Sequence, residues 1–194
     1  MTYPSSISSE ELLELPVANF DGPISVIDNT EDPSYAEAIE YLSAQQVIGF
    51  DTETRPTFTS GSPHHKVALL QLSGADKAFL FRLQHTGIPA PLQNILCSDK
   101  IAKVGAAVRD DIRGLQAYAH FQPRNFVDLQ SLTAQWGITE KSVRKMSAII
   151  LGLRVSKAQQ LSNWEAPRLS VAQIKYAAID AWICREMYVK LTSE

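Results

Sequence analysis

Apolar and polar positions along the chain follow two patterns, one typical of strands and one typical of helices. Short apolar runs bounded by turn residues predict strands, and apolar residues three or four positions apart predict helices. The expected strands are Ile24–Ile27, Val47–Glu53, Val67–Ser73, Ala78–Arg82, Ile101–Ala107 and Phe126–Leu129. The expected helices are Ser9–Leu15, Pro33–Gln45, Pro91–Cys97, Asp110–Ala119, Ser142–Leu151 and a long final helix, which begins at a Ser170–Gln173 capping box and ends near Leu191.

The order of these elements predicts an α/β fold. Three strands in succession, then alternating helices and strands, then helices, indicate a mixed sheet with helices on its faces. The gap Gly74–Lys77 has the length of a hairpin turn, so the strands on either side of it should be antiparallel. The segment Arg55–His65 contains two Pro residues and Gly61, and we expect it to be a loop.

Two carboxylates end the apolar run Val47–Glu53. Side chains alternate along a strand, so Asp51 and Glu53 face the same side. Two like charges that emerge together from a buried strand are costly unless something neutralises them. Hard divalent cations such as Mg²⁺ and Mn²⁺ bind carboxylate oxygens. Taken alone, the pair would be interpreted as a solvated strand end, and the rest of the chain changes that interpretation.

Two further acidic positions stand out. Asp110 and Asp111 follow a strand that ends in small residues, and by themselves they are explained as an N-cap and a first-turn carboxylate. Tyr176 and Asp180 are four residues apart on the last helix and share one face. Asp180 lies among apolar residues and needs a partner if it is buried. The alternative is an exposed Asp180 beside a half-buried Tyr176.

Composition and charge divide the chain into an acidic N-terminal part and a more basic remainder. With 194 residues, 45% of them apolar, it suits one globular domain with a sizeable core. Residues 1–40 hold nine acids and no Lys or Arg, so all 18 basic residues lie beyond them. We expect an acidic N-terminal extension over 1–20 and one domain over 21–194. The basic stretch Lys141–Lys175 would be an ordinary basic surface or the place where a polyanion binds.

Three features of the sequence indicate where in the cell the protein is found. No apolar window is long enough for a membrane span. The N-terminus lacks the basic start and apolar stretch of a signal peptide. Cys97 and Cys184 are far apart and lack metal-ligand spacing. We therefore expect a cytoplasmic, intracellular protein that does not bind membranes.

The three acidic motifs in this order resemble the DEDD superfamily of 3′→5′ exonucleases. Tyr176 places the resemblance in the DEDDy branch, to which ribonuclease D and the Werner-syndrome exonuclease domain belong; Lys175 stands where the other branch has His. The stretches Ile48–Glu53, Val67–Leu72 and Leu161–Trp164 are also similar to the family. The similarity spans roughly residues 24–191. It implies an RNase H-like mixed sheet of about five or six strands flanked by helices.

The resemblance also implies an activity, which is metal-dependent hydrolysis of DNA or RNA phosphodiesters from the 3′ end. Two divalent ions, Mg²⁺ or Mn²⁺, would be held by Asp51, Glu53, Asp111 and Asp180, and Tyr176 would orient the attacking water. Asp111 is preferred to Asp110 because the acid of the family precedes an apolar helix residue, here Ile112. The alternative function is a catalytically silent nucleic-acid-binding module of the same fold.

Contacts to the substrate are expected from basic side chains and from one aromatic residue. A positively charged groove follows the phosphate backbone, and an aromatic side chain can stack on a base. The expected contacts are Arg55, Phe58, Lys141, Lys145, Lys157 and Arg168. The family often carries a helical accessory domain after the nuclease fold, and we expect none here because the sequence ends at Glu194. The choice between DNA and RNA, and between repair and RNA processing, stays open.

Overall fold

A six-stranded mixed sheet forms the centre of the protein. The computed structural model describes residues 2–58 and 65–193, so part of the expected loop Arg55–His65 lies outside the described residues. The strands are β1 (Ile24–Ile27), β2 (Val47–Thr54), β3 (Val67–Ser73), β4 (Ala78–Arg82), β5 (Ala102–Gly105) and β6 (Phe126–Asp128), and their order in the sheet is β1-β4-β3-β2-β5-β6. Three pairs are parallel (β1 with β4, β2 with β5, β5 with β6) and two are antiparallel (β2 with β3, β3 with β4). The predicted mixed sheet and the antiparallel hairpin around Gly74–Lys77 are confirmed.

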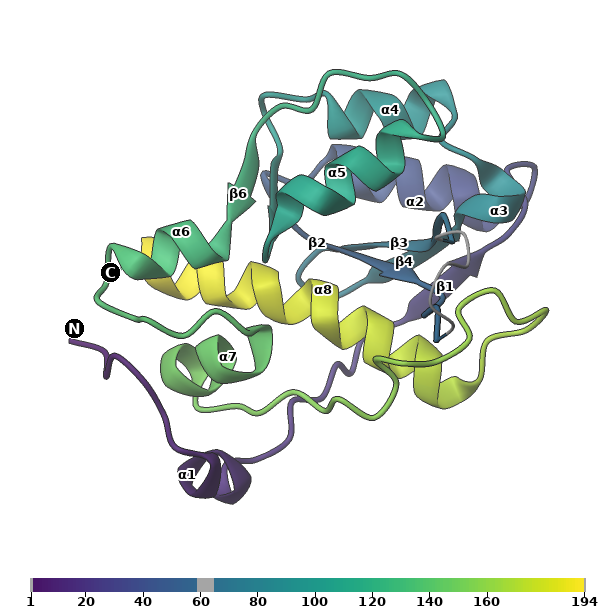
Figure 1. The fold of residues 1–194 in the computed structure, drawn as a ribbon. Helices are drawn as coiled ribbons and strands as arrows, with labels where there is room; N and C mark the ends of the chain where they lie inside the picture. Colours follow the sequence, from purple (N-terminus) through teal and green to yellow (C-terminus); the bar gives the residue numbers. More distant parts are fainter. Residues whose placement is uncertain (1, 59–64, 194) are drawn as a thin grey trace.

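Helices cover both faces of this sheet (Figure 1). The helices of the described residues are α1 (Ser9–Glu14), α2 (Pro33–Ser43), α3 (Leu83–Thr86), α4 (Ala90–Leu96), α5 (Val108–Gln116), α6 (Leu129–Ala134), α7 (Val143–Leu151) and α8 (Val171–Thr192). The prediction missed α3 and α6, because these short helices follow β4 and β6 directly, with no turn residue between strand and helix to mark where they begin. It also extended β5 by a residue at its start and two at its end, since the apolar run continues into the turn before α5.

The two faces of the sheet have separate cores. Helices α2, α4 and α5 lie on one face, where Ile48 and Phe50 of β2 pack with apolar residues of these helices. The long helix α8 crosses the other face, with α7 packed on its far side (Figure 1). Side chains alternate along a strand, so Gly49 and Asp51 of β2 face α8, on the side of the sheet opposite to Ile48, Phe50 and Thr52.

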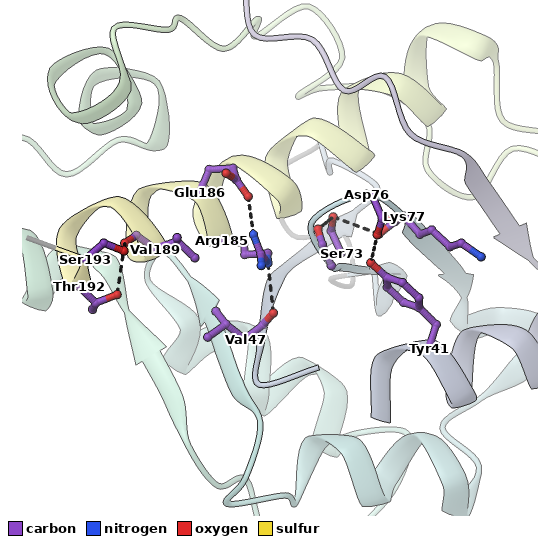
Figure 2. Close-up of polar contacts among 11 residues, drawn as sticks. Tyr41, Val47, Ser73, Asp76, Lys77, Arg185, Glu186, Val189, Thr192 and Ser193 are labelled. Carbon is purple, nitrogen blue, oxygen red and sulfur yellow. Dashed lines mark hydrogen bonds and ion pairs between the residues drawn. The ribbon is translucent and has the colours of Figure 1, made fainter. Parts of the chain in front are cut away.

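Helix α8 lies unusually close to β2. A Cβ atom at Gly49 would lie only 1.8 Å from the backbone oxygen of Ala181, so only glycine fits at this crossing. Further along α8, Arg185 donates a hydrogen bond of 3.2 Å to the carbonyl of Val47 and pairs with Glu186 (Figure 2). The close crossing and this tie fix the register of α8 over β2, and the register places the acidic residues of the two elements together.

The N-terminal segment packs against the rest of the domain through residues 12–20. Leu12, Ala18 and Phe20 are buried. The amide of Ala18 donates to the carbonyl of Arg154 at 2.9 Å, and the Arg154 side chain donates to the carbonyl of Leu15 at 3.0 Å. These contacts hold the predicted N-terminal extension against the domain. None of the helices in the described part of the chain has the length and apolar character needed to cross a membrane.

Candidate active site

Asp51 and Glu53 extend from β2 toward α8, as alternation predicted. They meet Asp180 of α8, which is buried. Each of these three side chains offers an oxygen, and the three oxygens lie within 4.8 Å of one another. In the described residues, none of the three carboxylates forms an ion pair with Lys or Arg. The protein itself therefore leaves most of the negative charge of this cluster without a counterion.

Tyr176 lies one helical turn before Asp180 on the same face of α8. Ala177 and Ala181 are buried against the sheet, and their small side chains let the helix come close enough to bring Asp180 to β2. The indole of Trp164, which is 1% exposed, packs against the Tyr176 ring with 6.0 Å between the ring centroids. This contact limits the directions in which the Tyr176 hydroxyl can point.

Asp111 approaches from the opposite face of the sheet. It lies in the first turn of α5 and accepts a hydrogen bond of 2.5 Å from Thr52, the β2 residue between the two acids. It is not among the three carboxylates that lie within 4.8 Å of one another. Its charge nevertheless reaches them, because it raises the pKa values of Asp51 and Glu53.

The predicted N-cap at Asp110 is wrong. The N-cap of α5 is Ala107, which adopts a left-handed conformation, so the helix starts earlier than predicted and both acids fall in its first turn. Asp110 points away into solvent, with a side chain that is 87% exposed and paired with Arg113. The two neighbouring acids thus have different surroundings, and only Asp111 lies at the cluster.

Burial is the largest cause of the pKa shifts in this cluster. It raises the pKa of Asp51 well above its ordinary value, and the charges of Asp180 and Asp111 raise it further. Burial and then the charge of Asp51 raise the pKa of Glu53 to about 9. Burial also raises the pKa of Asp180, against a hydrogen bond from Tyr176 that lowers it. The pKa of Asp111 is raised to about 6, with the Thr52 hydrogen bond opposing the effect of burial.

The donor set fits hard divalent cations. Three converging carboxylates with no Cys or His among them match the oxygen ligands of Mg²⁺ and Mn²⁺. A bound cation would oppose these pKa shifts, because its positive charge stabilises the ionised form of each buried carboxylate and offsets the repulsion among them. Asp51, Glu53 and Asp180 could hold one ion, and Asp111 lies on the other side of β2, where it could contribute to a second.

A cleft of about 310 Å³ opens above the acids and has a basic wall. Lys141 and Lys157, two of the residues expected to contact the substrate, line it, and so does Arg144, which the prediction did not select. Lys145 and Arg168 do not line it, and Lys145 pairs with Glu140 at 2.9 Å. Residues 141–144 end one loop and begin α7, so their place at the cleft depends on how α7 packs on α8.

The two predicted contacts after β2 lie beside the cleft. Arg55 pairs with Glu165 at 3.2 Å, and Glu165 also contacts His65 at 3.0 Å. Phe58 is 80% exposed and borders, with Arg55 and Leu161, a separate hollow of about 170 Å³. Arg55 is therefore engaged within the protein, whereas the Phe58 ring is free to contact another molecule.

Sequence reasoning missed three residues that shape this site. Thr52 could have been found, because alternation places it on the face opposite to Asp51 and Glu53, toward α5. Trp164 was noted only as part of a similar stretch, and its contact with Tyr176 joins a loop to a helix. Arg144 was counted among the bases, but nothing in its neighbourhood in the sequence separates it from Lys145.

The family of the chain follows from comparison with known proteins. The model of the 3′-5′ exonuclease family matches residues 26–194, and the chain belongs to this family. Exonuclease 3′-5′ domain-containing protein 2 of Drosophila melanogaster is 34% identical over an alignment of 176 residues, and the match covers 87% of this chain and 30% of that protein. Ribonuclease D of Gluconacetobacter diazotrophicus is 30% identical over an alignment of 174 residues, and the match covers 88% of this chain and 42% of that protein.

The fold agrees with this membership. The crystal structure of Escherichia coli ribonuclease D superposes with a TM-score of 0.76 and 25% identity, and the match covers 91% of this chain and 45% of that chain. The expected RNase H-like mixed sheet is thus confirmed. The chain spans less than half the length of these ribonuclease D relatives and about a third of the Drosophila protein.

The raised pKa values predict how stability depends on pH and metal. A carboxyl with a higher pKa in the folded protein binds its proton more tightly there than in the unfolded chain. Folding therefore becomes less favourable as pH rises from the pKa of the unfolded chain to the pKa of the folded protein. For Glu53 this interval runs from 4.5 to about 9, and for Asp111 from 3.8 to about 6. In EDTA, the melting temperature should fall as pH rises from 5 to 9.

Adding Mg²⁺ or Mn²⁺ should reverse this loss, and more strongly at pH 8.5 than at pH 5.5. At 100 times the dissociation constant the gain is about 2.7 kcal/mol, or about 5–10 °C for a chain of this size. Differential scanning fluorimetry at both pH values measures the effect, with K⁺ at equal ionic strength as the control. A metal-induced shift of equal size at both pH values would contradict the prediction.

Proposed function

We propose that this protein is a metal-dependent 3′→5′ exonuclease acting on DNA or RNA. The observation that carries the proposal is the convergence of Asp51, Glu53 and Asp180, with oxygens within 4.8 Å of one another at the base of a cleft with a basic wall. Membership of the 3′-5′ exonuclease family supports it. Such a cleft has an acidic floor that suits divalent cations and a wall that suits phosphates.

The chain's own residues would divide the work as follows. Asp51, Glu53, Asp111 and Asp180 would hold two divalent ions. The chemistry that these ions would supply is a hydroxide nucleophile near neutral pH and neutralisation of the charge on the leaving oxygen. Lys141 and Lys157 would bind phosphate oxygens from the opposite wall. The exposed ring of Phe58, beside the cleft, would stack on a base near the 3′ end.

Tyr176 would position the attacking water by a hydrogen bond. Burial and the charge of Asp180 raise its pKa above the ordinary value of 10, so the hydroxyl stays protonated at neutral pH. A protonated phenol is a poor general base but a good hydrogen-bond donor and acceptor. The packing of Trp164 on its ring would keep the hydroxyl in one direction.

A catalytically silent nucleic-acid-binding module is the second candidate. Such a module would need the basic wall but not the acids, and close, unpaired carboxylates repel a polyanion. The presence of the complete set of Asp51, Glu53, Asp111, Asp180 and Tyr176 therefore favours the enzyme. The named ribonuclease D relatives leave the sugar specificity of this chain open, so both substrates belong in the test.

The proposal predicts stepwise loss of nucleotides from free 3′ ends. Linear single-stranded DNA and RNA labelled at the 5′ end should shorten one nucleotide at a time with Mg²⁺ or Mn²⁺, and EDTA should stop the reaction. A circular single strand and a linear strand with a blocked 3′ end should stay intact. Denaturing gels measure all of these. Binding of the linear strands without any shortening would favour the silent module, and cutting of the circle would indicate an endonuclease.

A further inference from the structure

Arg144 differs from the other described basic residues of the cleft, because it has an inaccessible donor without a hydrogen-bond partner. It is the second residue of α7 and lines the same cleft as Asp51, Glu53 and Asp180. Its side chain is partly buried, and its Nε atom is inaccessible to solvent and has no hydrogen-bond partner. In the part of the chain that the structure describes, its guanidinium forms no ion pair either.

An inaccessible donor without a partner is costly to a folded protein, and a charged one more so. The neighbouring bases avoid this cost. Lys145 pairs with Glu140, and the ammonium of Lys141 donates to the carbonyl of Gln130 at 2.8 Å. Lys157 is exposed, so water can satisfy it. Among these four basic residues, only Arg144 has an inaccessible donor without a partner, its Nε atom.

The geometry points to Arg144 as the residue that binds a phosphate group of the substrate in the cleft. We infer that the two Nη groups of its guanidinium, which are not among the inaccessible atoms, bind two non-bridging oxygens of the phosphodiester nearest the 3′ end, opposite the carboxylates. The planar fork of donors in Arg matches a phosphate in two parallel hydrogen bonds, which a Lys ammonium cannot reproduce. This inference rests on the proposed function, because it assumes a nucleic acid in the cleft.

The contact should act mainly on binding. The phosphodiester is charged before and during the reaction, so a guanidinium bound to it stabilises both states. Arg144→Gln should therefore raise KM by roughly 10- to 100-fold, the range for a hydrogen bond to a charged group, and change kcat less. Arg144→Lys should recover part of the loss, because it keeps the charge but not the fork.

Two probes separate this role from a structural one. Kinetics use a 5′-labelled single-stranded 12-nucleotide DNA with Mn²⁺. Fluorescence anisotropy of the same strand in EDTA, at several salt concentrations, measures binding without cleavage; loss of one phosphate contact should reduce the slope of log K against log salt by about 0.7. Arg124→Gln is the matched control, since Arg124 is exposed and pairs with Asp99 at the opposite end of β5 and β6. Melting temperatures of all variants complete the set.

The outcomes are distinct. A raised KM, a reduced salt slope and an unchanged melting temperature in Arg144→Gln alone support the contact. Parental KM and slope in Arg144→Gln would overturn it, as would a melting temperature several degrees below that of Arg124→Gln, which would make Arg144 a structural residue. If the parent protein degrades no strand, the proposed function fails; the anisotropy measurements then still decide whether Arg144 contacts phosphate.

Discussion

Asp51→Asn should reduce exonuclease activity at least about 10³-fold while leaving the protein folded. Asp51 is one of the three acids whose oxygens lie within 4.8 Å of one another, and the charges of Asp180 and Asp111 both raise its pKa. Its loss removes a ligand that a divalent ion needs, and metal ions contribute several kcal/mol to such reactions. About 4 kcal/mol corresponds to a factor of 10³ in rate.

The same variant should be more stable than the parent in EDTA at pH 8. Asparagine has nearly the shape of aspartate but no charge, so it relieves the repulsion that raises the pKa of Glu53. Asp110→Asn is the matched control, because that side chain is 87% exposed and lies outside the cleft. Rates on a 5′-labelled strand and melting curves test both statements. Undiminished cleavage by Asp51→Asn, in a preparation free of contaminating nuclease, would refute the assignment of the site.

Tyr176→Phe should slow cleavage by roughly 10²–10⁴-fold, the range for a positioned group that handles a proton. Phenylalanine fills nearly the same volume, so the contact with Trp164 survives and only the hydroxyl is lost. The melting temperature should stay close to that of the parent protein. The thermal shift on addition of Mn²⁺ should also persist, because the carboxylates are unchanged.

Tyr188→Phe provides the control for this change. It removes the same hydroxyl from the same helix, three turns further on and outside the cleft. Single-turnover rates of both variants, measured together with strand binding by anisotropy, separate chemistry from affinity. If Tyr176→Phe cleaves at the parental rate, then Tyr176 only packs in α8, even if the four carboxylates prove essential.

Much of the fold could be predicted because it depends on local patterns. The bounds of β1, β3 and β4 were predicted correctly, since each is a short apolar run between turn residues. The start of α8 was predicted from its capping box, which the structure contains. Helices α3 and α6 were missed, because each follows a strand directly and no turn residue marks where it begins.

The candidate site was partly predictable for the same reason. Asp51 and Glu53 share a face because side chains alternate on any strand, and Tyr176 and Asp180 share one because they lie a helical turn apart. The contact between these two pairs is decided by residues that are far apart in the sequence. It depends on Gly49, which lets α8 cross β2 at close range, and on the small residues of α8.

The sequence by itself determined the element types, the two acidic pairs and their chemical character, because propensity and periodicity act over a few residues. Tertiary structure alone decided which bases face the acids. Lys145 and Arg144 are neighbours in the chain, yet successive residues of a helix point about 100° apart, so one pairs with Glu140 and the other enters the cleft. Packing of α7 on α8 set that orientation, and packing likewise drew the acidic N-terminal segment onto the domain.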